Sequence, residues 1–301
     1  MRLPLLLVLF SCYASNVAYA ETASTDVKSN DESLVDERVQ DEKKVQDNPF
    51  VIMPHKANYL LPITYNPHPN DKPFREDDEY ADDLEKFEAK FQISFKMPLA
   101  IDLVGGGDLY FAYTNQSWWQ VYNKDDSAPF RETVHEPEVF MLFDNDWKIG
   151  GFTNSYWALG ANHQSNGRSG TLSRSWNRLY GSMVFDKGDF ALSATAWWRI
   201  PESRKDSPTD ATGDDNPDIT HYMGHFELVG LYGVGQQRYT FLIRDNLQQD
   251  NKGALQLTWS YPIHRNLRAY VQYFNGYGES LIDYDVHTQR IGIGIALNDL
   301  L

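Results

Sequence analysis

The sequence has almost no cysteine and, beyond its first residues, no long apolar run. Cys12 is the single cysteine among 301 residues, which excludes a fold held together by disulfides. No stretch after the N-terminal segment approaches the roughly 18 uninterrupted apolar residues that a transmembrane helix requires. Acidic residues outnumber basic ones, and the formal net charge is −15. Because nucleic acids are themselves negative, we expect no nucleic-acid partner.

Residues 1–20 have the pattern of a secretory signal peptide. Arg2 precedes an apolar run at 5–10, and Ala18-Tyr19-Ala20 has the small residues of a cleavage site. Cys12 could instead be a lipoprotein acylation site, although Phe10 fits that pattern poorly. An exported chain with no disulfide and no transmembrane helix belongs to one of two classes. It is either a soluble periplasmic or secreted domain, or an outer-membrane β-barrel.

Acidic residues are concentrated in two stretches near the N-terminus. Residues 21–47 carry nine acids and four bases, and residues 71–88 carry nine acids and three bases. A polar acidic stretch with few aromatic residues is typical of disordered or solvated chain. We therefore predict that 21–47 is a flexible acidic segment without a binding role and that the folded domain spans 48–301.

From Phe87 onward, apolar residues recur at every second position. Between Phe87 and Leu99 the alternate positions are apolar and most of those between them are polar, which predicts a strand with two different faces. Bacterial barrels have an even number of strands, so the apolar segment Tyr59–Tyr65 is predicted to be the twelfth. The other ten segments with this pattern are 107–122, 133–146, 148–163, 174–187, 189–200, 220–234, 237–247, 252–261, 266–277 and 286–298.

The connections between these segments also favour a barrel. Short turns such as 105–107 and 187–189 alternate with long polar loops such as 123–132 and 201–219, as periplasmic turns alternate with outer loops. A soluble β-sandwich would also alternate, so the signal peptide, the strand number and the aromatic residues near strand ends decide between them. We predict an all-β fold: a 12-stranded antiparallel transmembrane β-barrel of the bacterial outer membrane.

A polar stretch at 161–181 ends one predicted strand and begins the next. The larger apolar residues mark the odd faces of both strands as lipid-facing, so His163, Ser165 and Asn177 are predicted to lie outside the barrel at its rim. A serine supplies a nucleophilic hydroxyl, a histidine can take its proton, and an asparagine can orient the imidazole. The alternative is that these are solvated rim residues, because a His-x-Ser pair is common by chance.

Several motifs resemble those of the outer-membrane phospholipase A family. The main ones are Asn162-His163-Gln164-Ser165-Asn166-Gly167-Arg168-Ser169 and the run SRSWNRLY at 173–180. Others lie at 117–120, 127–133, 214–220 and 276–284, so the resemblance covers roughly 48–301. It implies a calcium-dependent phospholipase A1 and A2 that hydrolyses the 1- and 2-acyl esters of glycerophospholipids and lysophospholipids. The homodimer would be active and the monomer inactive.

The resemblance also implies roles for individual residues. Ser165 would be the nucleophile, His163 the general base and Asn177 the residue that orients it. One Ca²⁺ per active site of the dimer would bind the Arg168 carbonyl, the Ser173 hydroxyl and Ser127 of the partner subunit. Asp215 would belong to a further calcium site, which Gly170 weakens because the family can have an acidic residue at that position.

Asn115 lies on the predicted lipid-facing side of segment 107–122. An asparagine facing lipid is costly unless it forms a hydrogen bond across an interface, so we predict that it contacts a second copy in the dimer. It could instead lie near the lipid headgroups. Two other functions remain open: a rim-located protease, and a non-catalytic pore. The arginines that would line such a pore are Arg199, Arg238, Arg244, Arg268 and Arg290.

Overall fold

The computed structural model of the chain describes residues 33–46, 48, 51–76, 84–207, 209–210 and 212–298. The predicted signal peptide at 1–20, with Cys12, lies outside these residues. Within the described ranges, no helix is both long enough and apolar enough to cross a membrane.

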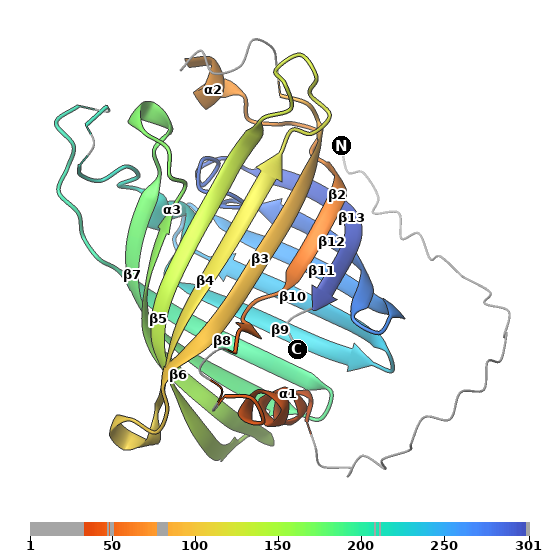
Figure 1. Cartoon of the computed structure of the whole chain (residues 1–301). Helices are drawn as coiled ribbons and strands as arrows, with labels where there is room; N and C mark the ends of the chain where they lie inside the picture. The colour runs from red at the N-terminus through yellow and green to blue at the C-terminus, as the bar shows by residue number, and fades with distance from the viewer. Residues whose placement is uncertain are drawn as a thin grey trace, which may run out of the picture. The chain divides into compact units, whose positions relative to one another are not determined.

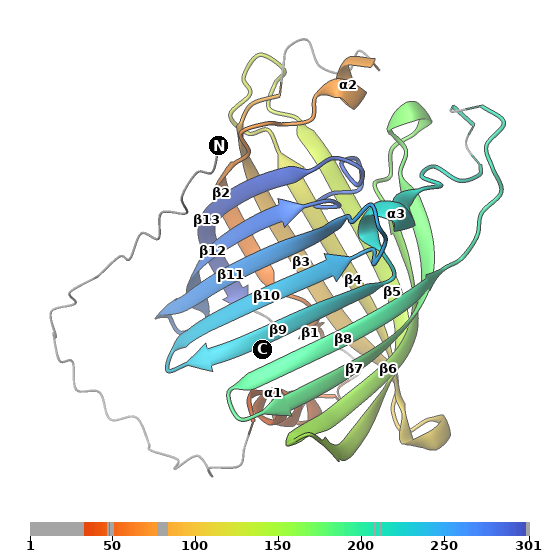
Figure 2. The ribbon, with the colours of Figure 1, turned by 180° about the vertical axis from the view of Figure 1, so that it is seen from behind.

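Antiparallel strands form one sheet that closes on itself (Figures 1 and 2). Twelve strands, β2 to β13, pair in chain order, and β13 closes the ring by pairing with β2. The two-residue strand β1, Met53–Pro54, pairs with β3, which also pairs with β2 at other residues. Strand β1 is therefore not counted among the strands of the ring. The predicted 12-stranded antiparallel barrel is therefore confirmed. The strands are β2 Asn58–Tyr65, β3 Phe87–Ala100, β4 Asp108–Trp119, β5 Phe130–Ile149, β6 Phe152–Ser165, β7 Ser175–Lys187, β8 Phe190–Arg199, β9 Phe226–Val234, β10 Gln237–Asp245, β11 Gly253–His264, β12 Leu267–Gly276 and β13 Thr288–Asn298.

Short helices lie before the first strand and in the connections between strands, and one of them corrects the sequence prediction. The strand predicted from residue 220 begins only at Phe226, because α3 forms first. Its Ile219 and Met223 are both buried. Residues four apart share one face of a helix and also one face of a strand, so their spacing did not distinguish the two. The helices are α1 Leu34–Lys43, α2 Lys72–Glu76 and α3 Ile219–Met223, with 3-10 turns η1 Val104–Gly106 and η2 Gly170–Leu172.

Helix α1 lies within the segment 21–47, for which the composition predicts a flexible acidic chain. Ser33 and Asp36 form a capping box, in which each side chain accepts a hydrogen bond from the other residue's backbone N–H at 3.1 and 3.0 Å. Leu34 is buried, and Glu42 forms an ion pair with Lys96 of β3 at 2.7 Å. The acidic composition did not predict this helix. It packs on the strands, and the ion pair between Glu42 and Lys96 stabilises it.

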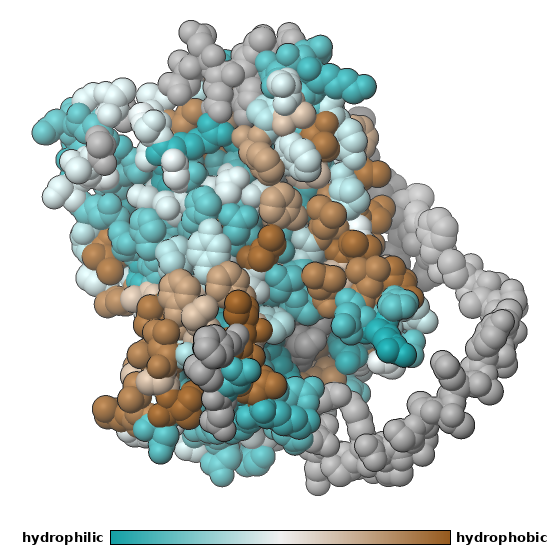
Figure 3. Space-filling model, viewed as in Figure 1, coloured by the Kyte–Doolittle hydropathy of each residue, from teal (hydrophilic) through white to brown (hydrophobic). Residues whose placement is uncertain are grey.

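The outer wall is apolar and the lumen is charged. On the outer wall Leu159 and Ile293 are 56% and 61% exposed, and apolar residues form brown patches across the middle and lower part of the face shown in Figure 3. Inside, Lys90 and Glu279 form an ion pair at 3.0 Å with only 2% and 1% of their side chains exposed. An apolar outer face around a polar interior is the arrangement of a membrane barrel.

The charged side chains of the lumen pair with one another. Glu88 forms ion pairs with Arg131 at 3.1 Å and with Arg290 at 2.7 Å, and Arg290 also contacts Glu279 at 2.8 Å. Arg290 is one of the arginines proposed to line a pore, yet it is buried in this network. The network therefore fills part of the lumen and argues against an open channel along these strands.

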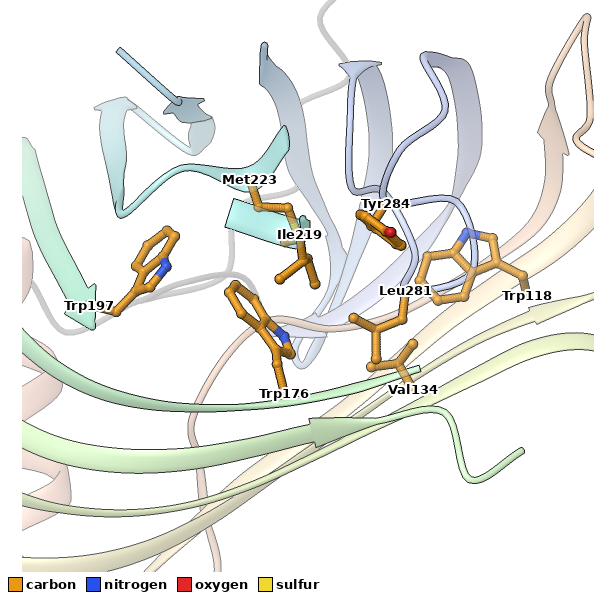
Figure 4. Packing of buried hydrophobic residues seen from close by; sticks show 8 residues of the cluster. All are labelled: Trp118, Val134, Trp176, Trp197, Ile219, Met223, Leu281 and Tyr284. Atoms are coloured by element: carbon orange, nitrogen blue, oxygen red, sulfur yellow. The ribbon is translucent and has the colours of Figure 1, made fainter. Parts of the chain in front are cut away.

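An apolar cluster lies at the end of the barrel near α3. Figure 4 shows side chains from four strands meeting those of α3 and of the segment 277–287. Trp176 of β7 lies perpendicular to Trp197 of β8, with ring centroids 6.3 Å apart. Because Trp176 is anchored inside, its neighbour Asn177 faces outward. The cluster contains Trp118, Val134, Trp176, Trp197, Ile219, Met223, Leu281 and Tyr284.

A bulge in β6 interrupts the predicted alternation of lipid-facing and inward-facing residues. The register of β6 against β7 shifts between Asn154 and Tyr156, and the side chain of Asn154 donates to the backbone oxygens of Tyr156 and Val184 at 3.1 and 2.9 Å. Ser155, predicted to face lipid, is buried and hydrogen-bonds to Asp186. Beyond the bulge, the odd residues Leu159 to His163 are exposed, as predicted.

Candidate functional site

Strands β6 and β7 bring His163, Ser165 and Asn177 to the outer wall of the barrel. Their register places His163 opposite Asn177 and Ser165 opposite Ser175. The His163 Nδ1–H donates to Asn177 Oδ1 at 2.9 Å. Because an amide oxygen only accepts, this bond places the proton of a neutral imidazole on Nδ1 and leaves Nε2 as the acceptor. The strand prediction and the outward placement of the pair agree with the structure.

Ser165 is the last residue of β6 and is partly exposed. It shares a face with His163, because side chains two residues apart on a strand point the same way. No hydrogen bond joins the two side chains within the described part of the chain. Catalytic hydrogen bonds are often long without substrate and shorten when it binds.

The loop that follows Ser165 is held by one buried side chain. Asn166 Oδ1 accepts from the backbone N–H groups of Arg168 and Arg174 at 3.3 and 3.0 Å, and its Nδ2 donates to the Leu172 carbonyl at 2.8 Å. Gly167 has φ +66°, a left-handed conformation that glycine adopts without strain. Sequence reasoning missed Asn166, although its polar type directly after Ser165 was a signal.

Two of the predicted calcium ligands lie together. Ser173 Oγ donates to Asp215 Oδ2 at 2.8 Å, and Ser175 Oγ donates to the same oxygen at 3.2 Å. Oxygen ligands of this kind fit a hard cation such as Ca²⁺. The other carboxylate oxygen of Asp215 forms an ion pair with Lys205, so this chain already supplies a positive charge there. Across the described residues, no group of three or more His, Cys, Asp or Glu could hold a metal ion.

Ser127 lies apart from these ligands along the chain, in the loop between β4 and β5. It has φ +62°, which is uncommon for a residue other than glycine. Within the described residues, no hydrogen bond links it to Ser173 or Arg168. Its proposed role is that of a ligand from a second subunit, which a single chain does not test.

Asn115 belongs to a polar group on β4 and β5. It accepts from Ser117 Oγ at 3.2 Å, and its Nδ2 lies 3.4 Å from His135 Nδ1, which also hydrogen-bonds to Tyr113 Oη at 2.6 Å. His135 lies opposite Ser165 in the β5–β6 register. Sequence reasoning missed His135. The alternation in β5 was a signal, because it places His135 on the same face as Thr133, which hydrogen-bonds to Ser117 of β4.

One further residue of the site was not predicted. Asn177 Nδ2 donates to Glu202 Oε1 at 3.2 Å, and Glu202 lies in the long connection between β8 and α3. No periodic pattern predicts the conformation of such a loop, so no local signal pointed to this contact.

A closed barrel with an apolar outer wall and a Ser-His-Asn group at its rim defines an integral membrane protein whose candidate chemistry faces the bilayer. Residues 35–297 match the family model for phospholipase A1, and the chain belongs to this family. The resemblance identified from the motifs is thereby confirmed. A phospholipase is an ester hydrolase, so the family places the chain among the enzymes.

The relatives match over nearly the whole chain. It is 38% identical to a phospholipase A1 of Klebsiella pneumoniae over 100% of both proteins. It is 36% identical to a phospholipase A1 of Escherichia coli strain K12 over 99% of this chain and 97% of the relative.

Solved structures agree with this assignment. Outer membrane phospholipase A from Escherichia coli has a TM-score of 0.76 at 37% identity, covering 85% of this chain and 95% of that one. A dimer of the Salmonella typhi outer membrane phospholipase with bound calcium has a TM-score of 0.76 at 36% identity, covering 86% and 97%. The chain has the fold of an outer-membrane barrel.

Proposed function

We propose that this protein is a calcium-dependent phospholipase A that hydrolyses the 1- and 2-acyl esters of glycerophospholipids and lysophospholipids. The observation that carries the proposal is the 2.9 Å hydrogen bond between His163 and Asn177 on the outer wall, on the same strand face as Ser165. An acyl ester in the bilayer can reach this wall without entering the lumen. The residue types are those of a serine hydrolase.

The roles of the three residues follow from their chemistry. Ser165 Oγ attacks the ester carbonyl while His163 Nε2 takes the hydroxyl proton and then gives it to the leaving glycerol oxygen. Asn177 Oδ1 holds the Nδ1–H of His163 and stabilises the imidazolium that forms. Water then attacks the acyl-serine, with His163 again acting as the base, and releases the fatty acid.

Calcium would be held by the Arg168 carbonyl and the Ser173 hydroxyl of one subunit and by Ser127 of the partner subunit. Asp215, which accepts from Ser173 at 2.8 Å, adds a carboxylate beside these ligands. When bound, the cation supplies positive charge that polarises the ester carbonyl. A relative, the Salmonella typhi outer membrane phospholipase, has been solved as a dimer with bound calcium, which supports the proposal that this chain binds calcium.

The homodimer would be the active form and the monomer the inactive one. A ligand contributed by a second subunit makes each site incomplete in a single chain. Asn115 and its neighbours Tyr113 and His135 offer polar groups on the outer wall, where a second copy would satisfy them better than lipid does. We propose that the subunits meet at Asn115.

The test is release of fatty acid from mixed phospholipid–detergent micelles by the refolded protein, with calcium and with EDTA. We expect release that requires calcium and that falls by about 10⁴-fold or more in Ser165→Ala. Circular dichroism controls for the fold of the variant. Undiminished release by Ser165→Ala would identify a different nucleophile. No release from a folded barrel under any condition would favour the pore.

A further inference from the structure

The hydrogen-bonded chain at the rim continues beyond Asn177. Its amide oxygen accepts from His163, and its Nδ2 donates to Glu202 Oε1 at 3.2 Å. Glu202 comes from the connection between β8 and α3, more than twenty residues further along the chain. The site therefore contains a carboxylate that is hydrogen-bonded to the asparagine through its amide nitrogen.

The part of the loop that carries Glu202 is fixed at its base. The backbone N–H of Ile200 donates to the carbonyl oxygen of Asn177 itself, at 2.8 Å. The backbone N–H of Asp214 donates to the Ser203 carbonyl at 2.7 Å, and Arg199 forms an ion pair with Asp214. Glu202 thus lies between Ile200 and Ser203, whose backbone groups are both hydrogen-bonded.

A glycine makes this closure possible. Gly213 has φ +106°, and a Cβ at this position would lie 2.9 Å from the Ser203 carbonyl oxygen. A larger residue would push the two sides of the loop apart. Lys205, on the same side as Ser203, forms an ion pair with Asp215 and gives the loop a second attachment.

The carboxylate of Glu202 decides which way the Asn177 amide points. A carboxylate at neutral pH only accepts hydrogen bonds, so it holds the NH₂ group toward itself and leaves Oδ1 for His163. Turned by half a rotation, the amide would present N–H to the Nδ1–H of His163, and that bond would be lost. A negative charge behind the amide also strengthens the acceptor oxygen, because hydrogen bonds in a chain polarise one another.

We propose that Glu202 is a positioning residue of the proposed catalytic group and acts through Asn177 on His163. The inference rests on the proposed function, because it assigns Asn177 the role of orienting the general base. Glu202 does not contact the reacting atoms. In a triad with aspartate, the negative charge contacts the histidine directly. Here Glu202 supplies the negative charge and acts on the histidine through Asn177.

The first test compares Glu202→Ala with Glu202→Gln in the calcium-saturated micelle assay. Glu202→Ala should lower kcat about tenfold with little change in KM, the effect of losing one hydrogen bond to a charged group. Glu202→Gln keeps an acceptor oxygen for Asn177 Nδ2 and should recover part of the loss. Asp206→Asn, an exposed acid in the same loop, is the matched control and should keep the wild-type kcat.

A double-mutant cycle then separates positioning from a general effect of the loop. In the Asn177→Ala background, Glu202→Ala should cost nothing further, because its only route to His163 is gone. An equal loss in both backgrounds, or a wild-type kcat in Glu202→Ala, would overturn the inference. Ser165→Ala separates this result from the proposed function: if that variant remains active, the catalytic group is wrong, whereas an inactive Ser165→Ala with a neutral Glu202→Ala overturns only the role of Glu202.

Discussion

The lumen and the rim of the barrel use polar residues of similar types in opposite ways. In the lumen, Glu88, Arg131 and Arg290 are buried and each charge contacts an opposite one. At the rim, the chain of hydrogen bonds runs from Glu202 through Asn177 to His163 and stops short of Ser165. In the lumen, positive and negative side chains neutralise one another. At the rim, the chain of hydrogen bonds ends at His163, on the same lipid-facing side as the Ser165 hydroxyl. That difference distinguishes a network that supports the barrel from the proposed reactive site.

The comparison predicts its largest effect in the lumen. Glu88→Gln removes the carboxylate between Arg131 and Arg290, so each of these buried guanidinium groups loses one of its two acidic partners. We expect it to lower the free energy of unfolding by about 3–5 kcal/mol. Urea unfolding in detergent micelles measures the change.

The matched control for this prediction is an exposed pair. Asp250 contacts Lys252 at 3.0 Å, with 68% of the Asp250 side chain exposed, so Asp250→Asn should leave the free energy of unfolding nearly unchanged. Equal losses in Glu88→Gln and Asp250→Asn would show that the lumen network does not support the barrel.

A smaller effect is expected in the loop that follows Ser165. Asn166→Asp removes the donor to the Leu172 carbonyl and places a carboxylate beside Glu132, whose Oε2 lies 3.5 Å from Asn166 Nδ2. Because this loop carries Arg168 and Ser173, the calcium concentration for half-maximal activity should rise about tenfold.

The reverse exchange sharpens that prediction. Glu132→Gln added to Asn166→Asp restores an N–H donor opposite the new carboxylate and should recover part of the calcium affinity. A double variant no better than Asn166→Asp, or a single variant with unchanged calcium dependence, would contradict the role given to Asn166.

The smallest effect is expected at α1. Burial alone would raise the pKa of Glu42, but Lys96 and Arg38 outweigh it and hold the pKa below its ordinary value of 4.5. A depressed pKa means that Glu42 stabilises the docked helix above pH 4.5 and that this contribution is lost as the pH falls through the folded-state pKa. Hydrogen exchange of the α1 amides should therefore accelerate in acid, and Glu42→Gln should remove that pH dependence. Exchange with the same pH dependence in both proteins would rule out Glu42 as the cause.

The sequence predicts the barrel well because period-two alternation records directly which side of a strand meets lipid. It predicts His163 and Asn177 on the outer wall for the same reason, and it fails at Ser155, where a bulge shifts the register. The helix α3 and the position of Glu202 depend on how a long loop closes, through Gly213 and the Arg199–Asp214 ion pair. Such contacts join residues with no regular spacing, so no local pattern reveals them.

The most direct test of the rim site is covalent labelling of the folded protein by a long-chain alkyl fluorophosphonate dissolved in the bilayer of lipid vesicles. Peptide mass spectrometry then locates the adduct. We expect an adduct on Ser165 that forms with calcium present and is strongly reduced in His163→Ala. An adduct on a different serine, or none on a protein that releases fatty acid, would contradict it.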